Sequence, residues 1–166
     1  MVRKIVLRIQ EKRIKNLLIA ALLLLIAACS NNSVYSNYQS IAETGWNKDS
    51  VARFTIDIAE TETETPCNVL VNIRHNSTYP YQNFWMFIAT TSPDGKTKQD
   101  TIECYLADNR GKWLGSGLSS VYNMPVLFKP NTVLKPGKYT FAIRQGMRDD
   151  VLPGITDIGI EIEKNK

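Results

Sequence analysis

The feature that most constrains the fold is a two-residue repeat of apolar side chains that recurs from about residue 51 to the end of the chain. In the segments 54–58, 69–73, 102–106, 139–143 and 158–162, every second residue is apolar and most of the residues between are polar. β-Branched and aromatic residues in this pattern are typical of half-buried strands. The segment 83–91 (NFWMFIATT) is apolar at most positions, so we expect a central strand buried on both faces, with Trp85 in the core.

Turn residues separate these segments. Pro93-Asp94-Gly95, Pro136-Gly137 and Pro153-Gly154 combine a fixed φ with a residue that tolerates positive φ. Residues 46–166 contain no amphipathic segment of helical length. The sequence therefore predicts an all-β domain over 46–166, a single antiparallel β-sandwich of about seven or eight strands, either immunoglobulin-like or jelly-roll-like.

Residues 1–28 have the organisation of an export signal. Six basic residues precede the apolar run 17–28, which as a helix would be about 18 Å long and too short for the roughly 30 Å hydrocarbon core. The sequence Ile26-Ala27-Ala28-Cys29 resembles the lipobox of bacterial lipoproteins. This resemblance implies that Cys29 is acylated and anchors the mature protein in the lipid bilayer. The alternative is an uncleaved signal anchor.

Residues 29–45 are predicted to be the lipidated cysteine and a flexible tether, because they are rich in Asn and Ser. Surface-exposed lipoproteins of Bacteroidetes often carry acidic residues directly after the cysteine. Here the first acidic residue is Glu43, so the resemblance favours the periplasmic face of the bacterial cell envelope over the cell surface.

Charge and composition exclude several functions. Once residues 1–28 are removed, 14 basic and 15 acidic residues remain, so no basic surface for nucleic acid is expected. His75 is the single histidine, and no Cys/His cluster with metal-ligand spacing is present. We expect a protein without catalytic activity, cofactor or metal. A hydrolase centred on His75 is the least favoured alternative, because this residue fits a solvent-facing or hydrogen-bonded loop position better.

Two cysteines remain after Cys29. Cys67 and Cys104 could form a disulfide in an exported protein, or they could be two buried thiols in strands. The sequence leaves both alternatives open.

Three stretches are more individual than a generic sandwich requires: 74–85 (RHNSTYPYQNFW), 108–117 (DNRGKWLGSG), and 137–148 with 152–160. In this order and spacing, together with the lipobox, they resemble the GldH family of gliding-motility lipoproteins of Bacteroidetes. The resemblance implies an envelope lipoprotein that is an accessory component of the gliding machinery. It implies no enzymatic activity and no cofactor.

Residues of the types that dominate protein interfaces occur in these stretches. The candidate partner-binding residues are Arg74, His75, Tyr79, Tyr81, Trp113 and Arg148. Tyr79 and Tyr81 flank Pro80, so we expect both in an exposed loop. The expected partners are other envelope or gliding-machinery proteins. The alternative function is carbohydrate binding or adhesion through these aromatic residues, and Arg148 could instead pair with Asp157 in a structural role.

Two short sequences suggest modification. Asp49-Ser50-Val51 and Asp100-Thr101-Ile102 resemble the three-residue O-glycosylation sites of exported Bacteroidetes proteins. Ser50 and Thr101 are therefore candidate O-glycosylation sites.

Overall fold

The computed structural model describes residues 33–60, 65–118 and 120–165, and its regular elements are all strands. In chain order they are β1 (Ser33–Ser40), β2 (Trp46–Asn47), β3 (Ala52–Ile58), β4 (Cys67–Asn76), β5 (Asn83–Thr91), β6 (Thr97–Tyr105), β7 (Ser116–Leu118), β8 (Val121–Thr132), β9 (Gly137–Gln145), β10 (Val151–Leu152) and β11 (Ile155–Lys164). Within these residues we find no helix that is long and apolar enough to cross a bilayer.

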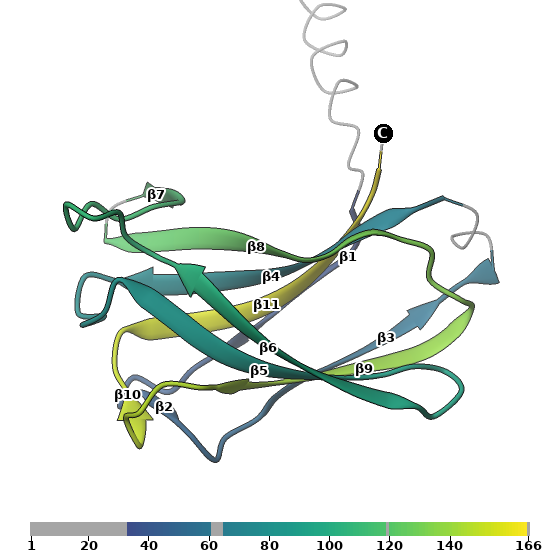
Figure 1. Ribbon diagram of the computed structural model, residues 1–166, viewed down its shortest axis with the longest axis horizontal. Helices are drawn as coiled ribbons and strands as arrows, with labels where there is room; N and C mark the ends of the chain where they lie inside the picture. The colour runs from purple at the N-terminus through teal and green to yellow at the C-terminus, as the bar shows by residue number, and fades with distance from the viewer. Residues whose placement is uncertain (1–32, 61–64, 119, 166) are drawn as a thin grey trace, which may run out of the picture. The chain divides into compact units, whose positions relative to one another are not determined.

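The strands form two layers, seen edge-on in Figure 1. One sheet has the order β1-β11-β4-β8-β7 and the other the order β3-β9-β5-β6, while β10 and β2 form a short ribbon. All strand pairs within them are antiparallel. The predicted antiparallel β-sandwich is confirmed, and the order of its long strands is that of a jelly roll rather than of an immunoglobulin fold.

Short and polar strands raise the strand number above the expected seven or eight. The largest difference is β1, which lies where a flexible tether was expected. It pairs with β11 from Ser33 opposite Glu163 to Ser40 opposite Asp157. As an edge strand, β1 is only partly covered and therefore lacks a clear apolar repeat. Cys29 and the signal segment 1–28 lie outside the described residues.

Strand β8 was not evident from the sequence because it contains Pro125 and Pro130. Proline lacks the N–H that a central strand needs and is confined to edges and bulges. Its neighbour β7 pairs with β8 only at Val121–Asn123, so most of β8 has an open edge on that side. The two prolines therefore fit this edge and protect it from pairing with other chains.

The core lies between the two sheets. Every second residue of each long strand points inward, as the two-residue repeat predicts. The buried residues include Val69, Val71, Ile73, Ile158, Ile160 and Ile162 from the five-stranded sheet and Phe54, Ile56, Phe84, Met86, Ile88, Phe141 and Ile143 from the four-stranded sheet. Burial of each such side chain stabilises the fold by about 1.5–3 kcal/mol.

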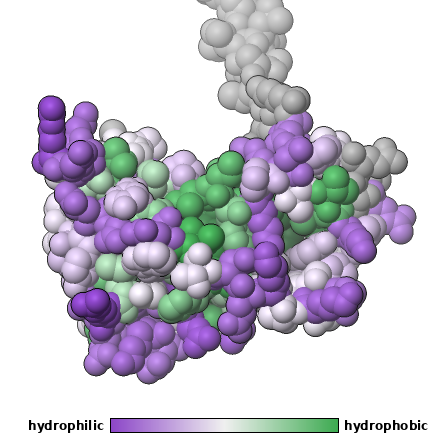
Figure 2. Space-filling model, in the orientation of Figure 1, coloured by the Kyte–Doolittle hydropathy of each residue, from purple (hydrophilic) through white to green (hydrophobic). Residues whose placement is uncertain are grey.

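One lateral side of the sandwich is less completely closed. Figure 2 shows apolar surface between the two layers on the side where β6 and β8 face the viewer in Figure 1. Ile102 of β6 and Met124 and Val126 of β8 are only partly buried against the core. An ion pair between Lys129 and Asp100, with 3.8 Å between Nζ and Oδ2, joins the two strands here.

The expectation that β5 is buried on both faces is wrong. Phe84, Met86 and Ile88 are in the core, whereas Trp85 and Phe87 point outward and are 37% and 49% exposed. The strand is central within its sheet, between β9 and β6, but no described element covers the outer face of that sheet. An apolar run therefore indicated a central strand correctly without indicating whether its second face is covered.

The predicted turns are present. Gly95 has φ of 78° and its N–H donates to the carbonyl oxygen of Ser92 across the β5–β6 turn. Gly154 has φ of 83°, and a Cβ there would lie 2.3 Å from the backbone N of Tyr79. Glycine at 154 is therefore required both by the turn and by the close approach of the chain around Tyr79.

Candidate functional site

Three of the candidate binding residues, His75, Tyr79 and Trp113, meet at one end of the sandwich. The His75 ring centroid is 4.7 Å from that of Trp113 in an edge-on arrangement and 5.9 Å from that of Tyr79. Tyr122 stacks on His75 with a centroid distance of 5.5 Å. His75 and Tyr79 are buried, and Trp113 is half-buried. This cluster closes the end of the core, and the sequence prediction that Tyr79 is exposed is wrong.

The polar atoms of this cluster are largely withdrawn from solvent. Tyr79 Oη donates a 2.7 Å hydrogen bond to the carbonyl oxygen of Asn83, and burial raises the pKa of Tyr79. His75 lies at the end of β4, not in a loop, with Nδ1 3.3 Å from the carbonyl oxygen of Asn76. Its Nε2 has no hydrogen-bond partner among the described residues, and burial lowers the pKa of His75 below 6.5.

Arg74 points to the opposite face of β4, away from this cluster. Its guanidinium carbon lies 3.7 Å from the centroid of the Tyr38 ring, a cation–π contact on the outer face of the five-stranded sheet. The neighbouring Asp157 accepts a 2.9 Å hydrogen bond from Ser40 Oγ. Asp157 thus has a different partner from the Arg148 that the sequence suggested.

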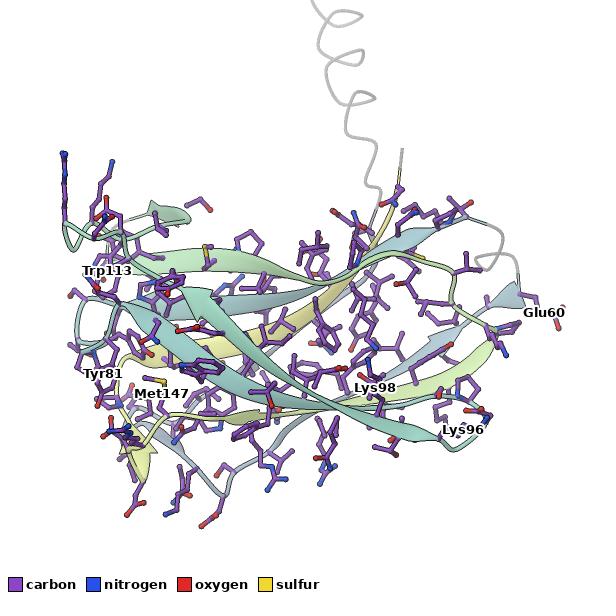
Figure 3. All side chains as sticks on the ribbon, viewed as in Figure 1. Glu60, Tyr81, Lys96, Lys98, Trp113 and Met147 are labelled. Atoms are coloured by element: carbon purple, nitrogen blue, oxygen red, sulfur yellow. The ribbon has the colours of Figure 1, made fainter. Side chains whose placement is uncertain are left out.

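Tyr81 and Arg148 belong to a third location, the end of the four-stranded sheet. Tyr81 Oη donates a 2.8 Å hydrogen bond to Asp149 Oδ2, and Arg148 is exposed beside them. Figure 3 shows Tyr81 and Met147 at the same end of the sandwich as Trp113. The six residues chosen from the sequence therefore divide among a buried cluster, one outer face and the end of the other sheet.

One exposed aromatic surface includes Trp85 and Phe87, which the sequence analysis placed in a strand buried on both faces. Trp85, Phe87 and Tyr105 all lie on the outer face of the four-stranded sheet and are 37%, 49% and 59% exposed. Exposed aromatic residues on neighbouring strands of one sheet face are typical of contact surfaces. We call this outer face of the four-stranded sheet the aromatic face. Its exposed or partly exposed apolar residues are Tyr81, Trp85, Phe87, Tyr105 and Met147.

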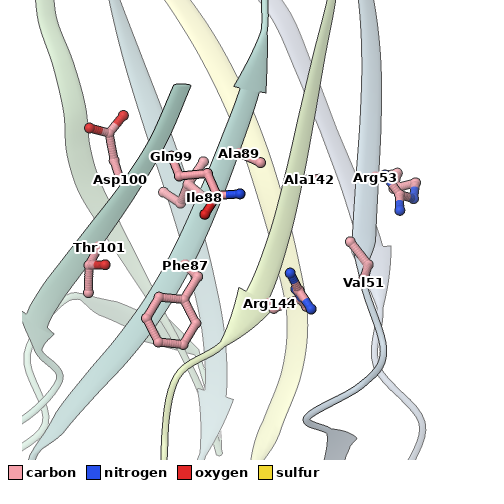
Figure 4. Close-up of a pocket in the computed structure, with 10 residues that line it drawn as sticks. All are labelled: Val51, Arg53, Phe87, Ile88, Ala89, Gln99, Asp100, Thr101, Ala142 and Arg144. Carbon is pink, nitrogen blue, oxygen red and sulfur yellow. The ribbon is translucent and has the colours of Figure 1, made fainter. Parts of the chain in front are cut away.

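Cross-strand register builds the aromatic face in rows. In one row, Phe87 of β5 lies between Thr101 of β6 and Arg144 of β9. The next row runs from Gln99 through Ala89 and Ala142 to Arg53. The two alanines leave a hollow of about 250 Å³, walled by Phe87 on one side and by the two arginines on the other (Figure 4).

Two further hollows continue along the same face. One, of about 450 Å³, is lined by Phe87, Arg144, Gly146 and Met147, among others. The other, of about 410 Å³, is lined by Tyr81, Asn83, Trp85, Gly146, Met147 and Arg148. Adjacent hollows share lining residues, so the three hollows follow one another along β5 and β9. We call this row of hollows the groove.

Charge is distributed unevenly over this face. The carboxylates at its end have local partners: Asp150 pairs with Lys48, Asp149 accepts from Tyr81, and Glu103 accepts a 2.7 Å hydrogen bond from Asn83. In contrast, Arg53, Arg144 and Arg148 form no ion pair with any described residue. The groove therefore combines exposed aromatic rings with guanidinium groups that form no ion pair with a described residue, although Asp49 lines the same hollow as Arg144.

Cys67 and Cys104 are not joined to each other in the structure. Cys67 begins β4 in the five-stranded sheet, and Cys104 lies in β6 of the four-stranded sheet, both buried. Their positions in different sheets favour the alternative without a Cys67–Cys104 disulfide. Burial, followed by the charge of Glu103, raises the pKa of Cys104 to about 12, so this thiol is held in its unreactive protonated form.

The candidate modification sites are both accessible. Ser50 is exposed in the connection between β2 and β3. Thr101 is exposed on β6 and lines the same hollow as Phe87 and Arg144. Both remain predictions. Among the described residues, no three His, Cys, Asp or Glu side chains are grouped so that they could hold a metal ion.

The fold and these surfaces define an antiparallel jelly-roll sandwich with an exposed aromatic face. Comparison with known proteins places it more specifically: residues 33–162 match the family model described as GldH lipoprotein, and the chain belongs to this family. It is 35% identical over 162 residues to "Gliding motility lipoprotein GldH" of Flavobacterium johnsoniae, with 92% of this chain and 98% of that protein covered. The resemblance found in the sequence is confirmed.

A second relative and one solved structure complete the comparison. The chain is 35% identical to "Gliding motility lipoprotein GldH homolog" of Christiangramia forsetii, covering 86% of this chain and 91% of that protein. The VP2 subviral particle of infectious bursal disease virus aligns with 80% of this chain and 33% of its own, at 14% identity and a TM-score of 0.34. A TM-score this low supports no functional conclusion.

Proposed function

We propose that this protein is a lipid-anchored accessory component of the gliding or envelope apparatus and works by protein–protein contact. Two relatives named for gliding motility support the biological setting. The single structural observation that supports a contact function is the aromatic face, where Trp85 and Phe87 are exposed on a sheet that no described element covers. Aromatic and arginine side chains together are the commonest energetic centres of protein interfaces.

The anchor in this proposal is acylated Cys29, and the favoured location is the periplasmic face of the membrane. The lipobox Ile26-Ala27-Ala28-Cys29 supports the anchor, and the lack of acidic residues directly after Cys29 supports the location. Two or three acyl chains would hold the domain at the membrane almost permanently, because each buried methylene contributes about 0.8 kcal/mol. The domain would then meet its partners within a thin layer above the bilayer.

The experiment is cross-linking in intact cells, purification of the protein in detergent, and mass spectrometry of the cross-linked peptides. The proposal expects cross-links from Lys48, beside the aromatic face, to other envelope proteins, with fewer from Lys164, at the end of β11 in the opposite sheet. Lys164 is the matched control because it is a lysine of the same chain in β11. If Lys48 yields no protein cross-links and the purified material contains only lipid, the contact function is wrong.

A second candidate function is carbohydrate binding. The hollow lined by Tyr81, Trp85, Asn83 and Arg148 combines aromatic rings with hydrogen-bonding groups, as sugar sites do. The sequence suggested Tyr79 and Trp113 for this role. Tyr79 is buried in the core and Trp113 is half-buried, so the test uses Tyr81 and Trp85 instead. Binding on a glycan array that is lost in Trp85→Ala would favour this function, whereas the absence of any glycan signal would exclude it for the sugars tested.

A further inference from the structure

The aromatic face also carries information about the chemistry of its partner, and the starting point is the hollow over Ala89 and Ala142. These residues face each other across β5 and β9, and their short side chains leave a depression between larger neighbours. Phe87 forms one wall and Arg53 and Arg144 form the other (Figure 4). A side chain entering here would meet an apolar floor and two guanidinium groups.

Two arginines and one carboxylate line the hollow. The carboxylate is that of Asp100, and it is directed to Lys98 at 3.0 Å and Lys129 at 3.8 Å. Arg53 and Arg144 have no ion-pair partner among the described residues. Arginine presents donors in a planar fork that matches a carboxylate, so the missing counter-charge is best supplied by an acidic group.

The spacing of the hollows indicates the shape of the ligand. The hollow over Ala89, the Phe87 ring and the Trp85 ring follow one another along β5 at every second residue. An extended peptide has the same repeat, because alternate side chains point to the same side at a rise of about 3.3 Å per residue. A strand-like segment lying along β5 can therefore place successive inward side chains against successive features of the groove.

We propose that the groove binds an extended acidic segment of another protein. An Asp or Glu side chain of that segment occupies the hollow between Arg53, Arg144 and Phe87. An apolar side chain further along the segment packs against Trp85 and Met147. This assignment rests on the proposed contact function and adds to it the chemical class of the partner segment.

The test is site-specific photo-cross-linking of the full-length protein in its own membranes. The photo-reactive residue p-benzoylphenylalanine replaces Gln99, which is exposed beside the hollow, and a second version carries it at Leu127, exposed on the other sheet. Mass spectrometry identifies the cross-linked peptide. The expected result is a peptide containing Asp or Glu that is captured from position 99 and not from position 127.

Charge reversal then examines the arginines. R144E and R53E are expected to lower the yield of the position-99 cross-link by at least about tenfold, because a like charge would face the partner carboxylate. Arg110→Glu is the matched control, since Arg110 is an exposed arginine that does not line the hollow, and it should leave the yield unchanged. Replacing the captured Asp or Glu by Arg in the partner is expected to restore the cross-link to R144E.

The outcomes separate the two levels of the argument. Protein cross-links that persist in R144E and R53E, or that come from a peptide without acidic residues, would overturn the acidic-segment assignment and leave the contact function standing. The absence of any protein cross-link from position 99 would overturn both. Capture of a glycan in place of a peptide would support the carbohydrate alternative and contradict the proposal.

Discussion

The outer faces of the two sheets differ in whether their aromatic and arginine side chains pack against each other or stand exposed. On the five-stranded sheet, Arg74 is stacked on Tyr38, and Asn72 Nδ2 donates a 2.9 Å hydrogen bond to Glu161 Oε2. On the four-stranded sheet, Trp85 and Phe87 stand exposed beside arginines that lack described ion-pair partners. The contacts on the first face contribute to stability, although Asn123 Oδ1 and Thr156 Oγ1 beside Arg74 have no hydrogen-bond partner among the described residues. The second face leaves its aromatic rings and arginines open to a partner.

This difference has a simple origin in the sequence of each strand. Gly159 in β11 leaves room for the Tyr38 ring, since a Cβ there would lie 2.7 Å from the ring, and Tyr38 in turn supports Arg74. On the other sheet, Ala89 and Ala142 also leave room, but no side chain of the described residues fills it. Small residues therefore allow Tyr38 to pack beside Arg74 on one face and leave the hollow over Ala89 and Ala142 on the other.

The largest expected effect is on partner binding. Replacing Trp85 and Phe87 together by Ala should lower the cross-linking yield in cells by about 30-fold or more, as loss of a central aromatic contact costs about 2 kcal/mol. The free energy of unfolding should change little, because both rings are substantially exposed. Leu127→Ala on the opposite sheet is the control for exposed apolar residues and should alter neither quantity. Equal loss of binding in L127A would remove the distinction between the faces.

The next effect is on stability and concerns the outer face of the five-stranded sheet. Gly159→Ala should lower the free energy of unfolding by about 1–3 kcal/mol, because the new methyl group displaces Tyr38 and the Arg74 stacked on it. Urea unfolding followed by circular dichroism measures this change. Ala142→Val adds methyl groups to the open hollow instead, so it should weaken partner binding with little loss of stability. A stability loss in A142V as large as that in G159A would mean that the hollow is already filled.

A smaller effect distinguishes the two sets of arginines. Arg74→Ala should lower the free energy of unfolding by about 0.5–1 kcal/mol, the usual contribution of an accessible cation–π contact. Arg144→Ala should leave stability unchanged and reduce binding. Thermal unfolding of the two variants in parallel makes the comparison, and a larger destabilisation by R144A than by R74A would contradict it.

The smallest effect is a pH dependence of the free energy of unfolding, caused by His75 in the cluster at the end of the core. The folded protein holds His75 neutral among Tyr79, Trp113 and Tyr122, and burial lowers the pKa of His75 below its ordinary 6.5. The unfolded chain therefore binds a proton at higher pH than the folded chain does. The free energy of unfolding should decrease as pH falls through 6.5 toward the folded-state pKa.

His75→Phe keeps an aromatic ring in the cluster and removes the titration. Urea unfolding measures the free energy of unfolding of this variant from about pH 7.5 to about pH 5, the range in which histidine titrates. This free energy should depend less steeply on pH in the variant than in the unchanged protein. The same slope in both proteins would show that other groups cause it.

Much of the fold could be predicted from the sequence, since the apolar repeat in strands such as 54–58 and 158–162 marks their inward residues directly. Strands β1 and β8 could not be predicted in this way. β1 is a half-exposed edge strand of Asn, Ser and Tyr residues, and β8 is interrupted by two prolines that only its open edge allows. Jelly-roll connectivity also had to come from the structure, because the repeat does not specify which strands pair.

The candidate site was harder to predict for a related reason. The sequence shows that Trp85 lies in an apolar strand, but whether the outer face of that strand is covered depends on the rest of the fold. Tyr79 presents the opposite case: it flanks a proline in a connecting segment, yet its ring is buried and its hydroxyl group bonds to the carbonyl oxygen of Asn83. Local composition predicted correctly that Tyr81 is exposed. It could not reveal the arginine-lined hollow, whose rows join four strands.

The central claim is that the aromatic face is covered by another protein in the cell, and hydroxyl-radical footprinting tests it most directly. Oxidation of Trp85, Phe87 and Met147 is measured in intact cells and in the purified full-length protein, with Leu127 and Val133 as exposed reference residues. The account predicts that the three residues of the aromatic face are several-fold less oxidised in cells while the reference residues react equally in both samples. Equal oxidation of Trp85 and Phe87 in cells and in the purified protein would contradict it.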